Sequence, residues 1–141
     1  IVVNKNYKEK SCFWIMRYEL AHDLQTRMEE IIKILNLNHI DIDRVRCVRS
    51  YGSSTRSTLA RCHTIGKAMQ KAMGLKAFYT IEFLKRFDKL SKEEQDKVII
   101  HELMHIPKSF GGGFRQHDYV CDRNVALLYK KYVNLNKSAI K

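Results

Sequence analysis

The residues best suited to chemistry in this chain form the segment His101-Glu102-Leu103-Met104-His105, which has the pattern H-E-x-x-H. On a helix, side chains four positions apart lie about 6 Å apart along the axis and roughly 40° apart around it. The two imidazoles therefore face the same way and can bind one zinc ion through nitrogens at about 2.0–2.1 Å. Glu102 flanks the ion without binding it, so its carboxylate can take a proton from the attacking water and deliver it to the leaving amine. We interpret the motif as the centre of a zinc peptidase.

A catalytic zinc site usually has three protein ligands and one open position. His117 is the favoured third ligand, because the preceding residues 106–116 include three consecutive glycines whose backbone freedom lets the chain fold back. Asp118 and Asp122 are alternatives, since related enzymes take a carboxylate from a later helix. Asp118 is better suited to support a ligand or to cap the final helix. The predicted site has His101, His105 and His117 on zinc, with Glu102 as the general base.

Other side chains could join this site, but the sequence assigns them no role. They are three histidines and three tyrosines, namely His22, His39, His63, Tyr51, Tyr79 and Tyr119. Structural or surface roles are expected for the histidines, although His63 lies in a predicted strand that can approach the metal. A tyrosine hydroxyl can hydrogen-bond a developing oxyanion or simply pack. Residues 77–84 form a predicted strand, which could present its edge to a peptide or lie in the core.

The helix that carries the motif has signals at both ends. Ser91-Lys92-Glu93-Glu94 is a capping box, in which the Ser91 hydroxyl accepts from the Glu94 amide and the Glu94 carboxylate reaches back to Ser91. Pro107, the only proline in the chain, disfavours helical geometry at the residue before it. We therefore expect this helix to begin after Ser91 and to end directly after His105.

The remaining elements follow from hydrophobic patterning. Apolar residues at three- and four-residue steps predict a helix over 16–35. Strands are predicted over 43–50, 58–63 and 77–84, and further helices over 65–73 and 118–133. This order of elements indicates an α+β fold with a small mixed or antiparallel sheet. The 141 residues are expected to form one domain that spans 1–141.

The composition favours a folded cytoplasmic protein. Apolar residues make up 45% of the chain, and no run approaches the roughly 18 residues of a membrane span. The first residues, Ile1-Val2-Val3-Asn4-Lys5, lack the pattern of a secretory signal. The four cysteines form no C-x-x-C pair and are expected to be free thiols: Cys12, Cys47, Cys62 and Cys121. A monomer is favoured.

The formal net charge is +11, and part of the excess is clustered. Basic residues gather in two groups, Arg44, Arg46, Arg49, Arg56 and Arg61, and Lys130, Lys131, Lys137 and Lys141. A field of this sign attracts polyanions such as DNA or RNA, or it keeps the protein soluble. Charge alone does not distinguish these two interpretations.

Residues 101–117, HELMHIPKSFGGGFRQH, resemble the signature of a metallopeptidase family of archaea and phages. The basic segment 49–56, Ala60-Arg61 and residues 90–94 resemble the same family, so the resemblance covers about 45–132. More distantly, the pattern is similar to the SprT-like and WLM zincins, some of which clear proteins crosslinked to DNA. The resemblance implies a minimal zincin-like fold, zinc on His101, His105 and His117, and Glu102 as general base. The gap before the third histidine is shorter than is usual in SprT proteins.

Two functional hypotheses follow. The first is a zinc metalloendopeptidase that hydrolyses peptide bonds of a protein or peptide substrate, with DNA as a further partner through the basic surface. The second is a basic nucleic-acid-binding protein in which the zinc site is structural or vestigial. A fourth protein ligand on the metal would favour the second hypothesis, and an open position would favour the first.

Overall fold

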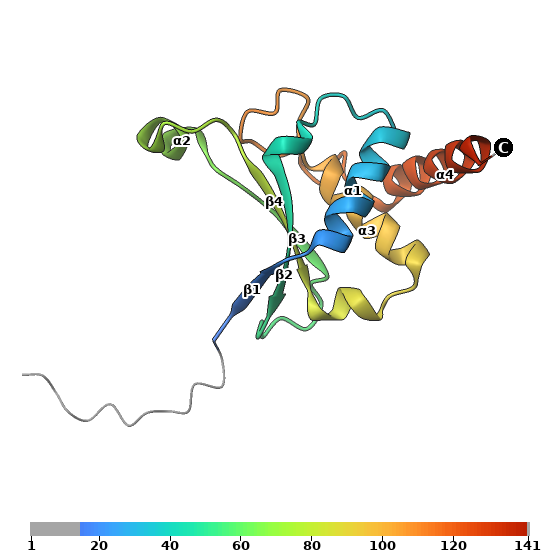
Figure 1. Ribbon diagram of the computed structural model, residues 1–141, viewed down its shortest axis with the longest axis horizontal. Coiled ribbons are helices and arrows are strands. Elements are labelled where there is room, and N and C mark those ends of the chain that lie inside the picture. Colours follow the sequence, from blue (N-terminus) through green and yellow to red (C-terminus); the bar gives the residue numbers. More distant parts are fainter. Residues whose placement is uncertain (1–14, 141) are drawn as a thin grey trace, which may run out of the picture.

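The computed structural model describes residues 15–140 of the chain (Figure 1). In chain order the elements are β1 (Arg17–Leu20), α1 (His22–Ile34), η1 (Ile42–Arg44), β2 (Val45–Tyr51), β3 (Ala60–Thr64), α2 (Lys67–Met73), β4 (Tyr79–Leu84), η2 (Lys85–Lys89), α3 (Lys92–Met104) and α4 (Asp122–Ala139). Elements labelled η are short 3-10 helices. None of the helices in the described part has the length and apolar character needed to cross a bilayer.

The four strands form one sheet in the order β1-β2-β4-β3. β2 and β4 are parallel, whereas β1 pairs with β2 and β3 pairs with β4 in antiparallel fashion. The sheet is therefore mixed, and the predicted α+β class is confirmed. The strand predicted over 77–84 lies inside the sheet, so its suggested role as an exposed edge is wrong. On that side the edge strand is β3, and no other strand among residues 15–140 pairs with its outer side; we call this its free edge.

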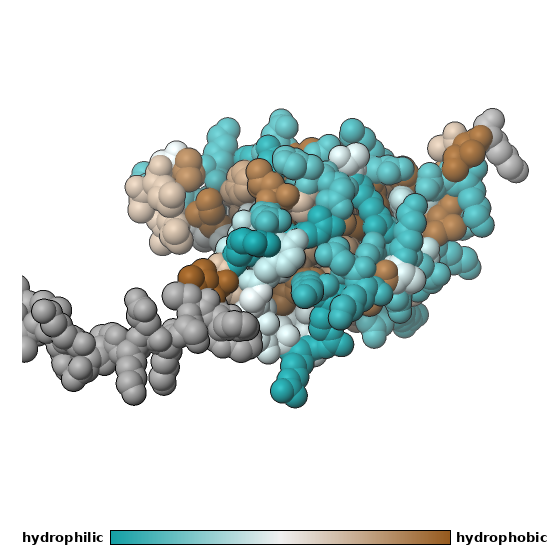
Figure 2. All heavy atoms as spheres, turned by 60° about the horizontal axis from the view of Figure 1, so that its bottom comes forward, coloured by the Kyte–Doolittle hydropathy of each residue, from teal (hydrophilic) through white to brown (hydrophobic). Residues whose placement is uncertain are grey.

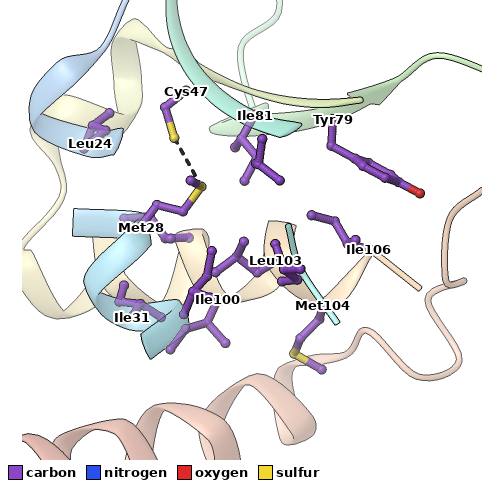
Figure 3. Close-up of a cluster of buried hydrophobic side chains, with 14 of the residues drawn as sticks. Leu24, Met28, Ile31, Cys47, Tyr79, Ile81, Ile100, Leu103, Met104 and Ile106 are labelled. Atoms are coloured by element: carbon purple, nitrogen blue, oxygen red, sulfur yellow. Dashed lines mark hydrogen bonds between the residues drawn. The ribbon is translucent and has the colours of Figure 1, made fainter. Parts of the chain in front are cut away.

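Helices α1, α3 and α4 lie on one side of the sheet (Figure 1). The core is formed where α1 and α3 meet the inner face of the sheet (Figure 3). Its central members are fully or almost fully buried: Met28 and Ile31 from α1, Ile100 and Leu103 from α3, and Cys47 and Ile81 from the sheet. The Cys47 thiol donates to the Met28 sulfur at 3.5 Å. On this face the two central strands place apolar side chains at alternate positions, Val45 and Cys47 from β2 and Tyr79, Ile81 and Phe83 from β4.

The helix predicted over 16–35 is wrong at its start. Residues 17–20 form β1, because their backbone pairs with residues 48–51 of β2. Leu20 continues the apolar spacing of the following helix, but its side chain is 63% exposed. The helix α1 begins at His22. Periodicity alone did not distinguish a terminal helical turn from a strand whose partner is about 30 residues away.

The final helix begins later than predicted, at Asp122 instead of residue 118, and it continues to Ala139. Residues 116–121 form a turn, in which the amides of Tyr119 and Val120 donate to the carbonyl of Gln116. The Asp118 carboxylate accepts from the Tyr119 amide within this turn. Asp118 therefore does not cap α4, whose N-cap residue is Cys121.

The signals around the motif helix are confirmed. The reciprocal capping box of Ser91 and Glu94 is present, and α3 ends with His105 as its C-cap residue. The predicted helix over 65–73 is present as α2, and Gly74 closes it in the left-handed conformation at φ 64°. Cys47, Cys62 and Cys121 are free thiols, whereas Cys12 lies outside the described residues.

The surface shown in Figure 2 is mostly hydrophilic over the body of the molecule. Apolar side chains gather instead on the projecting α2 end, at the left of the view. Met69 and Met73 of α2 are each 57% exposed, and Leu75 is 48% exposed. The helices that carry the H-E-x-x-H motif and the core lie away from this projection (Figure 1).

Candidate metal centre

Helix α3 presents His101 and His105 one turn apart, and their rings turn toward each other. The two Nε2 atoms lie 3.3 Å apart. Two ligands of a tetrahedral zinc ion with bonds of about 2.0–2.1 Å are separated by about 3.3–3.4 Å. The spacing of the two imidazoles therefore fits a shared zinc ion.

His117 completes a cluster of three imidazoles. Ligand nitrogens of His101, His105 and His117 all lie within 4.8 Å of one another, which suits a single metal ion. The His117 ring centroid is 4.8 Å from that of His105 and 5.8 Å from that of His101. His117 is exposed and the other two are half-buried, so the cluster opens to solvent on the His117 side.

The loop that carries His117 is attached to the sheet by Tyr79. The amide of Gly112 donates to the Tyr79 hydroxyl at 3.0 Å, and the hydroxyl donates to the Gly113 carbonyl at 2.8 Å. Gly112 has φ +97°, and a Cβ at this position would lie 2.6 Å from the Ile65 carbonyl oxygen. The glycine is therefore required by both the backbone conformation and the close approach. Tyr79 was a candidate for oxyanion binding, but its hydroxyl is used in positioning this loop.

A second attachment fixes the orientation of a candidate metal ligand, His105. The Arg115 amide donates to the His105 carbonyl at 2.7 Å. The Nδ1 atom of His105 lies 2.8 Å from the Arg115 carbonyl oxygen, which can only accept a hydrogen bond. Nδ1 therefore carries the proton, and Nε2 keeps a lone pair directed at the His101 and His117 side.

Glu102 projects from α3 into the space beside the cluster and is only 7% exposed. Burial raises its pKa to about 7, and the backbone amide of Cys62 on β3 offsets a part of this effect. A cation bound at the cluster would act in the same direction as that amide. Burial also lowers the pKa of His101, as do the neighbouring His105 and His117, which favours the neutral form that binds metals.

The free edge of β3 runs past Glu102 and His101. The Leu84 amide donates to the Leu59 carbonyl, and the Ile65 amide donates to the Phe78 carbonyl. In antiparallel pairing, successive residues of a strand direct their backbone groups alternately toward the paired strand and away from it. The amides and carbonyls of Ala60 and Cys62 therefore point away from β4, toward the candidate site. The sequence predicted a strand over 58–63 but did not indicate that it lies at the edge of the sheet.

Two adjoining cavities lie along this edge and share Ala60, His101 and Glu102. The first has a volume of about 560 Å³, and its wall is apolar: Leu59, Ala60, Val98, Val125 and Ala126. The second has about 400 Å³ and surrounds the three histidines. A chain bound along β3 would pass the histidine cluster and have one side chain beside the apolar wall.

The other candidate residues lie elsewhere or have different roles. Neither Asp118 nor Asp122 belongs to the ligand cluster. Asp122 lines the apolar cavity, and its charge reaches His101. The Nε2 atom of His63 lies 2.6 Å from the Glu82 carboxylate, and that of His39 lies 3.3 Å from the Ile106 carbonyl. The rings of Tyr51 and Tyr119 face Arg17 and Arg115, respectively, and His22 is exposed on α1.

Comparison with known proteins gives one family. Residues 16–137 match the family described as "Putative phage metallopeptidase". No curated protein and no solved structure matches the chain. The matched region contains every described strand and the whole histidine cluster.

Proposed function

This chain belongs to the phage metallopeptidase family, and we propose that it is a zinc-dependent endopeptidase of zincin-like type. The observation that carries the proposal is the cluster of three imidazoles on and beside α3, with Nε2 atoms of His101 and His105 3.3 Å apart. Three nitrogen ligands are typical of catalytic zinc, which keeps a further position open. The relationship to SprT-like enzymes, the cytoplasmic location and the monomeric state stay predictions from the sequence.

The ligand set supports zinc and an open coordination position. Among residues 15–140 the cluster contains three ligand side chains and no fourth. A zinc ion held there would lower the pKa of water toward about 7 and polarise the scissile carbonyl. His101, His105 and His117 hold the metal, and the Arg115 carbonyl keeps the His105 ring in the correct tautomer.

Glu102 acts as the general base and then as the general acid. Its carboxylate lies beside the cluster and borders both cavities, so it reaches the space between a metal and a peptide on β3. The carboxylate takes a proton from the attacking water and delivers it to the amine that leaves. Only 7% of Glu102 is exposed, so its contact with solvent is limited to the two cavities.

The substrate is an extended peptide that pairs with the free edge of β3. The outward-pointing backbone groups of Ala60 and the carbonyl of Cys62 supply the hydrogen bonds, as in other cases of strand addition. Because cavities lie on either side of Ala60 along this edge, the peptide extends in both directions from the site, which favours internal cleavage. The apolar wall beside His101 favours a large apolar side chain next to the scissile bond.

The test uses the variant Glu102→Gln. The control is His22→Ala, which replaces an exposed histidine at the start of α1, outside the histidine cluster. We expect Glu102→Gln to retain zinc and to lose about 10²–10⁴-fold in peptide hydrolysis, because only the proton transfer is removed. Cleavage sites mapped by mass spectrometry should be internal and next to apolar residues. Hydrolysis by Glu102→Gln at the wild-type rate would refute the proposed role.

A second candidate function is nucleic-acid binding with a structural zinc site, and the net charge of +11 favours it. It requires a fourth protein ligand on the metal and no peptide hydrolysis. A crystal structure of the zinc-loaded protein would separate the two, because it shows whether the fourth position holds a protein side chain or solvent. The exposure of His117 and the open cavity around it support the enzyme.

A further inference from the structure

A separate hollow of about 230 Å³ lies where the loop after β2 meets the end of β4 and the short helix η2. Three hydroxyl side chains of the loop line it: Ser53, Thr55 and Thr58. Three basic residues of η2 also line it: Lys85, Arg86 and Lys89. We call this set of residues the basic hollow. It shares only Thr58 with the apolar cavity next to Glu102, so the two spaces are neighbours.

The positive charge of the basic hollow is not neutralised within the described residues. Lys85, Arg86 and Lys89 are exposed, and none of them forms an ion pair with a carboxylate of residues 15–140. The nearest acidic residue along the chain is Asp88, which is held by Arg49 at 3.1 Å. Asp88 is also not among the residues that line the basic hollow.

A buried hydroxyl also borders the basic hollow. Ser50 is 1% exposed, and its Oγ has no hydrogen-bond partner of good geometry among residues 15–140. Ser50 lies beside the Glu82 carboxylate, where burial acts to raise the pKa of Glu82 and the Ser50 hydroxyl acts to lower it. One Glu82 oxygen is held by His63 at 2.6 Å. Ser50 and Glu82 therefore interact with each other, and the groups of the basic hollow that are available to a ligand are its loop hydroxyls and basic side chains.

We propose that the basic hollow binds a backbone phosphate of a nucleic acid. A phosphate has several acceptor oxygens, which suits a site that combines hydroxyl donors with the forked donor of Arg86 and the point charges of two lysines. The overall charge of +11 favours a polyanion over a single acidic side chain. The site lies apart from the histidine cluster, and its occupancy does not depend on the proposed peptidase activity.

The test measures binding of a fluorescent oligothymidine to the full chain by anisotropy over a range of salt concentrations. The variant Lys85→Ala/Arg86→Ala/Lys89→Ala is compared with Lys130→Ala/Lys131→Ala/Lys137→Ala, which removes the same charge from the exposed face of α4. We expect the first variant to lose at least tenfold in affinity, with a salt slope smaller by about 0.7, which is the contribution of one phosphate contact on a single strand. The α4 variant should lose no more than about twofold.

A second, uncharged change keeps the test independent of net charge. Ser53→Ala/Thr55→Val removes two hydroxyls from the basic hollow and should weaken binding severalfold at constant salt slope. Amide resonances of residues 50–58 should shift on titration with the oligonucleotide, and inorganic phosphate should compete for the same amides. Three outcomes would each overturn the proposal. They are equal losses of affinity in the η2 and α4 triple variants, no binding of the oligonucleotide by the wild-type chain, and stronger competition by an acidic peptide than by phosphate.

Discussion

The hydroxyl of Tyr79 connects the sheet to the loop that positions His117. It accepts from the Gly112 amide and donates to the Gly113 carbonyl, while its ring is fully buried against Phe110 at a centroid distance of 4.8 Å. We expect Tyr79→Phe to keep the fold and to weaken zinc binding about tenfold, because the loop loses two hydrogen bonds that orient the third ligand. Competition with a chromophoric chelator measures this affinity.

The matched control for this change is Tyr132→Phe, which alters another buried tyrosine on α4. It should leave the zinc affinity within twofold of the wild type. If Tyr79→Phe binds zinc as tightly as Tyr132→Phe does, the loop is positioned without the hydroxyl and our account of it is wrong. Circular dichroism of both variants shows whether the fold is retained.

At the level of single residues, the sequence predicted the histidine cluster better than its supports. His101 and His105 belong to a local motif, and the three glycines before His117 indicated a chain reversal. The structure brings these three side chains together. The role of Tyr79 was not predicted, because it depends on a contact with Gly112 across 33 residues. Such contacts have no local pattern.

Helices α1 and α3 are joined by a largely buried ion pair. Arg27 donates to Asp96 at 2.7 Å, and the two side chains are 19% and 5% exposed. Arg27→Leu leaves the carboxylate buried without its partner, and we expect a loss of about 3 kcal/mol in the free energy of unfolding. Urea denaturation measures it. The control is Arg17→Leu, which removes an exposed pair with Glu19 and should cost less than about 0.5 kcal/mol. The double variant Arg27→Leu/Asp96→Leu leaves no unpaired buried charge, so it should recover most of the stability that Arg27→Leu loses. Failure of the double variant to recover would contradict this mechanism.

Arg49 links β2 to α1 through Asp23, with hydrogen bonds of 2.6 and 2.8 Å. These bonds lower the pKa of Asp23 from 3.8 to about 2. A carboxylate whose folded pKa is depressed adds stability above its unfolded pKa of about 3.9, and this is lost as the pH falls toward 2. Because Asp23 is 65% exposed, solvent screening limits the gain to about 1 kcal/mol or less.

The corresponding experiment compares the wild type with Asp23→Asn by urea denaturation between pH 6 and pH 2. We expect a constant difference in unfolding free energy above about pH 5, which shrinks toward zero as the wild-type carboxylate becomes protonated. A matched change on α3, Glu93→Gln, alters an exposed pair with Lys97. A difference for Asp23→Asn that does not change with pH would show that Asp23 acts by something other than its charge.

At the level of elements, predictions that rest on local signals were accurate, whereas those that depend on pairing between distant segments were not. The capping box and Pro107 predicted α3 almost to the residue, because both act within one turn of the helix. The start of α1 was wrong, since β1 is a strand only through its pairing with β2. The placement of β4 inside the sheet, and of β3 at its edge, depends on strand order. Hydrophobic alternation identifies a strand but does not determine its neighbours.

Considered as a whole, the molecule places its candidate chemistry where three separate parts of the chain meet. Helix α3 carries two histidines and Glu102, the glycine loop carries His117, and β3 supplies the free edge. The loop is held by Tyr79 of β4, so a metal on the three histidines would connect a helix to the sheet through that loop. Ligand binding to the folded chain alone stabilises it by mass action.

Zinc should therefore raise the unfolding temperature of the whole molecule. At free zinc of about 100 times the dissociation constant, the added stability is about 2.7 kcal/mol, which corresponds to roughly 8 °C for a chain of this size. Differential scanning fluorimetry measures the shift, and a chelator should reverse it. His117→Ala should lose most of the shift, because the link to the loop is broken, whereas His22→Ala should retain it. An equal shift in His117→Ala would mean that the metal is held by α3 without the loop, and the arrangement of ligands would need a different third member.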